Sequence, residues 1–300
     1  MNLFHQLSMI CYRLSRMMVD LIAIQLNSST SIDHNLARIE RLIDEARPLI
    51  VRNHPALILL PECAFQFGCS GKVLYEHAES LEKSSQSGKS TIQSHVKTWA
   101  NKYNAYIVAG SMPILCDETP EKFHAASLAF SPKGERIAQY NKMHLFDVDV
   151  EDNTASYRES KYTKAGEHLG KFSSPWGEVG LSVCYDLRFS AMFSAMQGVN
   201  IVTVPSAFTK VTGEAHWHAL LKARSIELQA YVIAANQVGE HEDNRQTFGN
   251  TSIYSPWGEL LSIVETGEGI ASAQFDHENL EKIRKRMPLQ SHKKERYTFE

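Results

Sequence analysis

The sequence predicts a single α/β domain in which buried parallel strands alternate with amphipathic helices. Three observations favour this class. Two short apolar runs, at residues 19–26 and 56–60, read as buried strands. Between them, apolar residues recur at three- and four-residue spacing over residues 32–50, which is one face of a helix. A strand, a helix and a strand with short joins form a βαβ unit with parallel strands, and the same alternation recurs along the chain.

Later segments repeat this pattern. Helices are expected over residues 91–103, 189–197 and 214–229, and a last helix ends near Arg286. Strands are expected over residues 105–110, 124–131, 135–140, 179–184, 200–204, 231–236, 251–254, 259–264 and 269–275. Three Pro-Xaa-Gly segments, at residues 131–135, 173–178 and 255–259, indicate turns between strands. We interpret them as independent hairpins, not a duplicated half, because the intervening helices do not match.

Composition narrows the class of partner. Apolar residues make up 43% and charged residues 22% of the 300, which is typical of a soluble globular protein. The formal charge of −3 provides no field that would attract nucleic acid. The basic stretch at residues 282–294 lacks interleaved aromatic residues and reads as a solvated helix and tail. No run approaches the ~20 apolar residues of a membrane span. We therefore expect neither a nucleic-acid nor a membrane partner.

The five cysteines are odd in number and sparse, which argues against a disulfide framework and favours a reducing, cytoplasmic location. No Cys-x-x-Cys pair occurs, and His144, Asp147 and Asp149 match no metal-ligand spacing, so no metal is expected. Residues 1–18 contain two arginines and no acid. We interpret them as a disordered extension before a domain over residues 19–300 that ends in a tail; a transit-like segment is the alternative.

Three polar residues of complementary chemistry follow expected strands: Glu62, Lys142 and Cys184. Since the carboxyl ends of parallel strands line the ligand crevice of α/β proteins, these side chains are candidates for one site. A thiol attacks a carbonyl best as a thiolate and therefore needs a base, a role that a buried carboxylate can fill. A lysine ammonium and the N–H of Tyr185 can stabilise an oxyanion.

Each residue also has a structural interpretation. A cysteine after an apolar strand is more often an inert core residue, a glutamate at a strand end is often a cap, and a lysine in a polar loop is usually solvated. Cys63 lies beside Glu62 but has no elbow-like context, and we interpret it as a packing residue. The pattern alone leaves a catalytic site and a set of unrelated residues both open.

A resemblance to the nitrilase superfamily, the carbon–nitrogen hydrolases, bears on this choice. The segments LPECAFQFG, YNKMHLFDVDV and GLSVCYDLRFS resemble that family's glutamate, lysine and cysteine motifs, in the family's order. The resemblance covers residues 19–297 and implies that Glu62 is the general base and acid, Lys142 the oxyanion stabiliser and Cys184 the nucleophile. It also implies a second glutamate, Glu159 in YRESKYTKAGE, that orients Lys142 or the attacking water.

Within the superfamily, residues 205–239 and 245–259 are similar to the Nit branch. This resemblance implies a cofactor-free amidase that acts on a small α-keto acid amide such as deaminated glutathione, through a thioester, with release of ammonia. The alternatives are an ω-amidase acting on α-ketoglutaramate, a nitrile or N-carbamoyl hydrolase, or a non-catalytic interaction protein. Arg188 is the candidate for binding the substrate carboxylate, with Thr212 as an added hydroxyl. For Arg188, a salt bridge to Asp186 is the structural alternative.

The resemblance further implies a four-layer αββα sandwich. In that family two such sandwiches pair through one face into an αββα–αββα dimer, and the C-terminal tail, here the segment after Pro288, reaches across to the partner. A homodimer or higher homo-oligomer is therefore expected.

Overall fold

The computed structural model describes residues 20–50, 54–81, 91–152, 154 and 156–294. The expected N-terminal extension, residues 1–18, lies outside the described residues. Along the described stretches, no helix combines the length and apolarity needed to cross a membrane.

Two six-stranded sheets form the centre of the molecule. The first has the order β16 (Gly269–Ala273), β1 (Leu21–Gln25), β2 (Ala56–Leu59), β3 (Ala105–Leu115), β4 (Phe123–Phe130) and β5 (Arg136–Asn141). The second has the order β15 (Leu260–Val264), β14 (Thr251–Tyr254), β11 (Tyr231–Asn236), β10 (Ile201–Ser206), β9 (Gly177–Leu181) and β8 (Gly170–Ser174). In each sheet the three central strands are parallel and the flanking strands are antiparallel.

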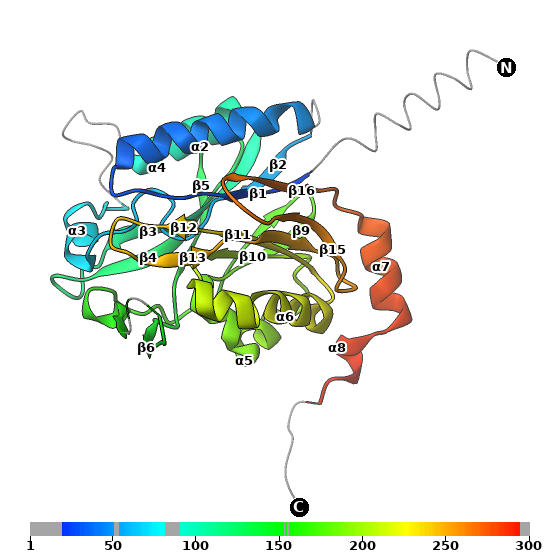
Figure 1. The fold of residues 1–300 in the computed structure, drawn as a ribbon. Coiled ribbons are helices and arrows are strands. Elements are labelled where there is room, and N and C mark those ends of the chain that lie inside the picture. The colour runs from blue at the N-terminus through cyan, green and yellow to red at the C-terminus, as the bar shows by residue number, and fades with distance from the viewer. Residues whose placement is uncertain (1–19, 51–53, 82–90, 153, 155, 295–300) are drawn as a thin grey trace, which may run out of the picture.

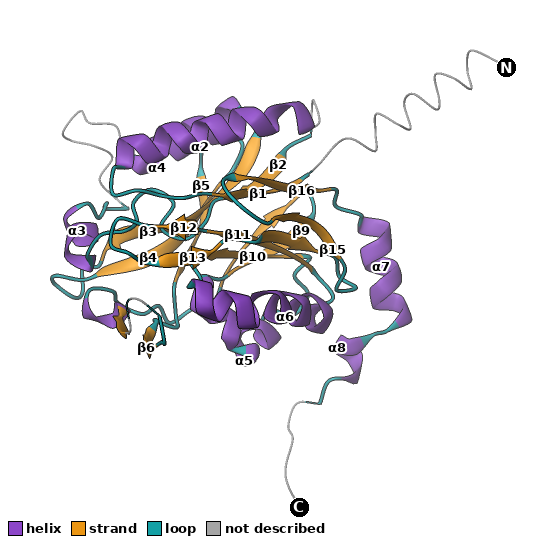
Figure 2. Cartoon of the chain, viewed as in Figure 1, coloured by secondary structure: helices purple, strands orange, loops and turns teal. Residues whose placement is uncertain are grey.

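Helices cover the outer face of each sheet (Figure 1). Helices α2 (Ile32–Ala46) and α4 (Ile92–Lys102) lie over the first sheet, and α5 (Ser190–Ala195) and α6 (Lys210–Leu228) lie over the second. Figure 2 shows the resulting order of helices, strands, strands and helices. Helices α7 (His277–Arg286) and α8 (Leu289–His292) lie to one side of these layers. The expected αββα sandwich is confirmed.

The alternating side chains of β1 show why its sequence is apolar throughout. Leu21 and Ala23 belong to the core between the two sheets, while Ile22 and Ile24 pack in a second core beneath α2 and α4. Because both faces of the strand are buried, the sequence shows a continuous apolar run and no polar alternation.

The Pro-Xaa-Gly segments join β4 to β5, β8 to β9 and β14 to β15, at three different sheet edges, so their prediction as turns between strands is confirmed. Gly134 shows why glycine is needed: its φ is 74°, and its N–H donates to the carbonyl of Ser131 at 2.8 Å.

Several short elements were not expected. They are α3 (Gly71–Glu76), the hairpin of β6 (Asp147–Asp149) and β7 (Ser156–Arg158), strand β8, and the hairpin of β12 (Val238–Glu240) and β13 (Gln246–Phe248). Strand β3 is also longer than its apolar pattern indicates, since it runs on to Leu115.

Candidate active site

The two sheets contribute different members of the expected constellation. Glu62 lies three residues beyond the end of β2 and Lys142 directly follows β5, both in the first sheet. Cys184 comes from the second sheet. We expected Cys184 to end a strand, but β9 stops at Leu181. Cys184 instead begins a 3-10 helix, η3 (Cys184–Arg188). The site therefore lies where the two sheets meet.

Lys142 is a buried ammonium held between two carboxylates. Its Nζ donates to Oε1 of Glu62 at 2.8 Å and to both oxygens of Glu159, at 3.1 Å and 2.8 Å. Burial disfavours the charge of Lys142, but the charges of Glu159 and then Glu62 outweigh burial and hold its pKa well above the ordinary value. Lys142 is therefore a permanent cation.

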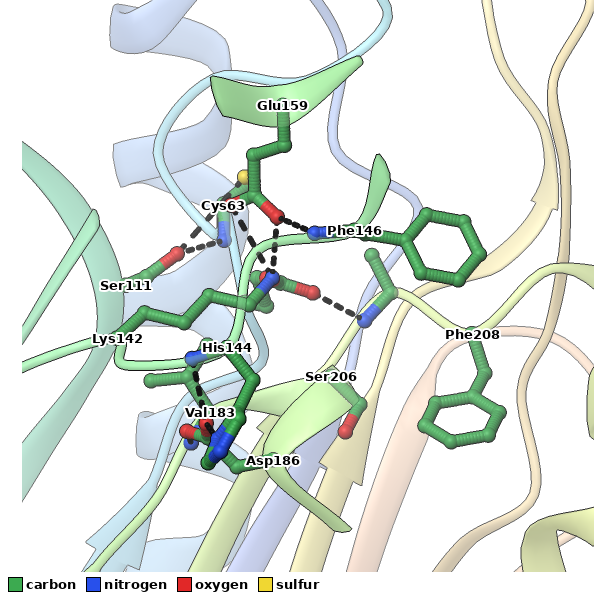
Figure 3. Close-up of polar contacts among 12 residues, drawn as sticks. Cys63, Ser111, Lys142, His144, Phe146, Glu159, Val183, Asp186, Ser206 and Phe208 are labelled. Atoms are coloured by element: carbon green, nitrogen blue, oxygen red, sulfur yellow. Dashed lines mark hydrogen bonds and ion pairs between the residues drawn. The ribbon is translucent and has the colours of Figure 1, made fainter. Parts of the chain in front are cut away.

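Glu159 begins a 3-10 helix, η2 (Glu159–Lys161), and is fixed from two sides (Figure 3). Besides Lys142, its Oε2 accepts the backbone N–H of Phe146 at 2.7 Å. Burial raises the pKa of Glu159, the charge of Lys142 opposes this rise, and the charge of Glu62 adds to it. Glu159 thus ties Lys142 to the loop that follows it.

Glu62 is buried and its second oxygen, Oε2, accepts the backbone N–H of Ala207 at 2.9 Å, just after β10. Burial, followed by the charge of Glu62, raises the pKa of the Cys184 thiol well above its ordinary value, against the effects of Lys142 and the Ala207 N–H. Loss of the thiol proton to solvent would add a negative charge to a cluster that already holds two carboxylates. Transfer of that proton to Glu62 leaves the net charge unchanged, which makes it the easier path.

Two cysteines in this region adopt left-handed backbone conformations, Cys184 with φ 49° and Cys63 with φ 53°. Such values are uncommon for residues other than glycine, so the backbone does not distinguish the two. Their contacts do. The Cys63 thiol lies 3.8 Å from Oγ of Ser111, and burial raises its pKa to about 12.

Asp186, which is fully buried, links the segments that carry Lys142 and Cys184. Its Oδ2 accepts the hydroxyl of Tyr140 at 2.7 Å and the N–H of Val183 at 2.8 Å. Its Oδ1 accepts the N–H of His144 at 3.1 Å and lies 2.7 Å from the imidazole Nδ1 of the same residue (Figure 3). The sequence singled out Asp186 only as an alternative partner for Arg188 and His144 only as a metal decoy.

Arg188 does not form the alternative salt bridge to Asp186, because the carboxylate of Asp186 accepts hydrogen bonds from the donors described above. The Arg188 guanidinium lies over the rings of Tyr185 and Phe208, at 5.9 Å and 5.3 Å, and its Nη1 is 3.1 Å from Nδ1 of His216. Within the described part of the chain, no carboxylate pairs with Arg188. Its positive charge is therefore available to bind a substrate anion.

A cavity of about 360 Å³ connects these groups. Its walls include all seven residues named from the sequence: Glu62, Lys142, Glu159, Cys184, Tyr185, Arg188 and Thr212. The Thr212 hydroxyl lies 2.8 Å from that of Thr209 at the start of α6. The volume falls in the range of small-molecule sites. Among the described residues, no cluster of His, Cys, Asp and Glu has the arrangement of a metal site.

The cavity also has walls that sequence reasoning missed. Asp243, Arg245, Gln246 and Thr247, all from the β12–β13 hairpin, line it together with Phe67 and Cys69. The hairpin strands are three residues each, too short and too polar to give a strand pattern in the sequence.

Comparisons with known proteins all identify the same family. The model of the carbon–nitrogen hydrolase family matches residues 22–285. A deaminated glutathione amidase from Yersinia enterocolitica is 39% identical over 90% of this chain and 91% of its own length. The omega-amidase NIT2 of Homo sapiens is 31% identical over 90% of this chain and 92% of its length. Nit3 of Saccharomyces cerevisiae, a member of branch 10 of the nitrilase superfamily, superposes with a TM-score of 0.78 at 28% identity, covering 92% of this chain and 96% of that structure.

Proposed function

The chain belongs to the carbon–nitrogen hydrolase family, and from this premise we propose that it is an amidase for a small α-keto acid amide, with deaminated glutathione as the preferred substrate. The observation that carries the mechanism is the Lys142 ammonium, held by Glu62 and Glu159 in the cavity that the Cys184 thiol lines. The names of the matched amidases support the substrate class.

In this mechanism Glu62 accepts the thiol proton as Cys184 attacks the amide carbon. The negative charge that develops on the carbonyl oxygen is stabilised by the positive charge of Lys142 and by the N–H of Tyr185. In the described part of the chain no acceptor is bonded to that backbone N–H of Tyr185, so it is available. Glu159 positions Lys142 through its contacts on both sides.

Breakdown of the tetrahedral intermediate breaks the C–N bond, and Glu62 gives its proton to the leaving amine. The thioester on Cys184 is then hydrolysed by a water whose proton passes to Glu62. The leaving amine depends on the substrate. A primary amide such as α-ketoglutaramate releases ammonia. The amide of deaminated glutathione joins the keto acid to cysteinylglycine, so this substrate releases the dipeptide and not the ammonia expected from the family resemblance.

Arg188 is the proposed contact for the carboxylate next to the keto group. Its guanidinium lines the cavity without a carboxylate partner in the described structure, so a substrate anion meets an uncompensated charge. Thr212 also lines the cavity and adds a hydroxyl.

The test compares wild-type protein with Cys184→Ala and Cys63→Ala on deaminated glutathione and α-ketoglutaramate. Wild type and Cys63→Ala should release keto acid from both substrates, and Cys184→Ala should release none. Full turnover by Cys184→Ala would exclude this mechanism. A nitrile and an N-carbamoyl amino acid in the same panel test the alternative chemistries, and absence of turnover with every substrate would favour a non-catalytic protein.

We also propose a homodimer in the cytoplasm. Helix α6 exposes Val211 and Ile226, and Trp257 and Leu260 are exposed near the turn into β15, which gives apolar area for a partner. The described cysteines are free thiols, as in reducing compartments. Light scattering that gives the mass of one chain would exclude the dimer, and fractionation would test the location.

A further inference from the structure

Arg245 provides another guanidinium on the cavity wall besides Arg188, and no pattern in the sequence singled it out. Its Nε and Nη2 both lie 2.5 Å from Oδ2 of Asp243, and Nη2 also donates to the carbonyl of Cys69 at 3.2 Å. The guanidinium carbon lies 4.5 Å from the centre of the Phe67 ring. Arg245 is therefore held in one orientation by three groups, and a quarter of its side chain remains exposed.

The Nη1 amino group of Arg245 is the part of the guanidinium that has no hydrogen-bond partner among the described residues. Nε and Nη2 hold Asp243 and Cys69, and no described residue accepts a hydrogen bond from Nη1. Burial works against the charge of Arg245, but Asp243, Cys63 and Tyr157 raise its pKa above the ordinary value. A charged donor that is already fixed in place costs little further side-chain entropy when it binds an acceptor.

The two arginines contact different walls of the cavity. Arg188 belongs to the Cys184 helix η3 and lies over Phe208, on the side of the nucleophile. Arg245 instead contacts Phe67 and Cys69, in the segment that continues from Glu62. In the proposed mechanism Glu62 gives its proton to the leaving amine. We place the leaving group near the segment that follows Glu62, with its far end toward Arg245.

We infer that Arg245 is a specificity-determining residue whose Nη1 binds the terminal carboxylate of a peptide leaving group, so that the enzyme favours a dipeptide amide over a primary amide. This inference rests on the proposed function and extends it to the leaving-group side of the substrate. Cysteinylglycine has a carboxylate at its far end, whereas the ammonia released from α-ketoglutaramate has no group that could reach Arg245. The same cavity would thus bind both acyl groups equally and distinguish their leaving groups.

Asp243 limits the size of the effect. Its carboxylate compensates part of the Arg245 charge and repels an approaching anion. One charge-assisted hydrogen bond in such a setting changes affinity by about tenfold, and we expect a change of this order.

The experiment is a double-mutant cycle in which one change is made in the protein and the other in the substrate. Wild type and Arg245→Gln are each assayed with deaminated glutathione, with its C-terminal carboxamide analogue, and with α-ketoglutaramate. We expect Arg245→Gln to raise KM for deaminated glutathione by about tenfold with little change in kcat, and to leave α-ketoglutaramate kinetics unchanged. Wild type should lose a similar factor on the carboxamide analogue, and Arg245→Gln should lose nothing more on it.

Other results overturn the inference in distinguishable ways. Equal losses on all three substrates would mean that Arg245 only supports the hairpin, and unchanged kinetics with deaminated glutathione would mean that it binds no carboxylate. If Arg245→Gln does not fold, wild type decides alone, since equal kcat/KM for the carboxylate and carboxamide substrates excludes a carboxylate contact. Wild type that prefers α-ketoglutaramate overturns the inference but keeps an amidase, and wild type that hydrolyses none of them overturns the proposed function as well.

Discussion

The hydroxyl of Tyr140 donates a 2.7 Å hydrogen bond to Oδ2 of the buried carboxylate of Asp186. Tyr140 lies two residues before Lys142, and Asp186 lies two residues after Cys184. The bond therefore joins β5, which directly precedes Lys142, to η3, which begins at Cys184, across the junction of the two sheets. The N–H of Val183 and the imidazole of His144 strengthen the same link.

Replacement of Asp186 by Asn should loosen this link. All the neighbouring groups of Asp186 that the structure orients are donors, so the amide NH2 of Asn would face N–H or O–H groups and leave buried donors unpaired. We expect the free energy of unfolding to fall by about 3 kcal/mol and kcat to fall by at least about tenfold. Urea unfolding and steady-state kinetics measure the two effects.

Asp276→Asn is the matched control. Asp276 is exposed, caps α7 by accepting the N–H of Asn279 at 2.8 Å, and Asn is an equally good N-cap. This variant should keep both stability and kcat. Asp186→Asn protein that behaves like the control would show that the link does not position the site.

Removal of the Lys142 ammonium should leave the carboxylates of Glu62 and Glu159 to repel each other. In Lys142→Met the carboxylates of Glu62 and Glu159 lose their buried counter-charge, and we expect a loss of about 3–5 kcal/mol of unfolding free energy together with loss of turnover. Adding Glu159→Gln removes one of the charges, so the double variant should regain stability but not activity. A double variant less stable than Lys142→Met would contradict the electrostatic account.

Substitution of Glu62 by Gln should separate turnover from thiol reactivity. The general base is lost, so kcat should fall by about 10²–10⁴-fold. The negative charge that helps to raise the pKa of Cys184 is lost too, while the Lys142 charge remains. Iodoacetamide should therefore modify Cys184 at neutral pH at least as fast as in wild type, as mapped by mass spectrometry. Wild-type kcat in this variant would contradict the assigned role of Glu62. A slower modification of Cys184 would mean that proton transfer to Glu62, and not the effect of Glu62 on the thiol pKa, controls the reactivity of Cys184.

Apolar patterns in the sequence indicate the central strands well because these strands are buried on both faces, whereas the sandwich was implied only by the family resemblance. Apolar runs such as the one that becomes β1 follow from burial alone, without knowledge of the neighbouring strands. The β12–β13 hairpin gives no such signal, since each of its strands has three residues and lies at the cavity wall. A prediction from apolar periodicity therefore finds the central strands and their helices and misses the segments that shape the cavity.

The same distinction holds for the site. Glu62, Lys142 and Cys184 were predicted because each follows a strand within a distinctive segment. Asp186 was not, because its partner Tyr140 is 46 residues away and the pairing depends on how the two sheets meet. Arg245 was missed for a similar reason, since only the folded hairpin brings it to Phe67 and Cys69.

His241 should make stability depend on pH below neutrality. Its imidazole is buried at the turn of the β12–β13 hairpin, with Nδ1 at 3.1 Å from the carbonyl of Ser28 and Nε2 at 2.7 Å from Oγ1 of Thr247. Burial lowers the pKa of His241 from its ordinary value of 6.5, although the Ser28 contact opposes this. The folded state therefore takes up the proton at lower pH than the unfolded state does.

The sign of the effect follows from this difference. Above pH 6.5 the imidazole is neutral in both states, and the stability contributed by His241 is fully present. As pH falls below 6.5, the unfolded state is protonated first, so the free energy of unfolding decreases by up to about 1.4 kcal/mol per pH unit until the folded pKa is passed. His241→Gln should remove this part of the slope in urea unfolding measured between about pH 5 and about pH 8. An unchanged slope in that variant would assign the pH dependence to other groups, because His241 would then bind protons equally in both states.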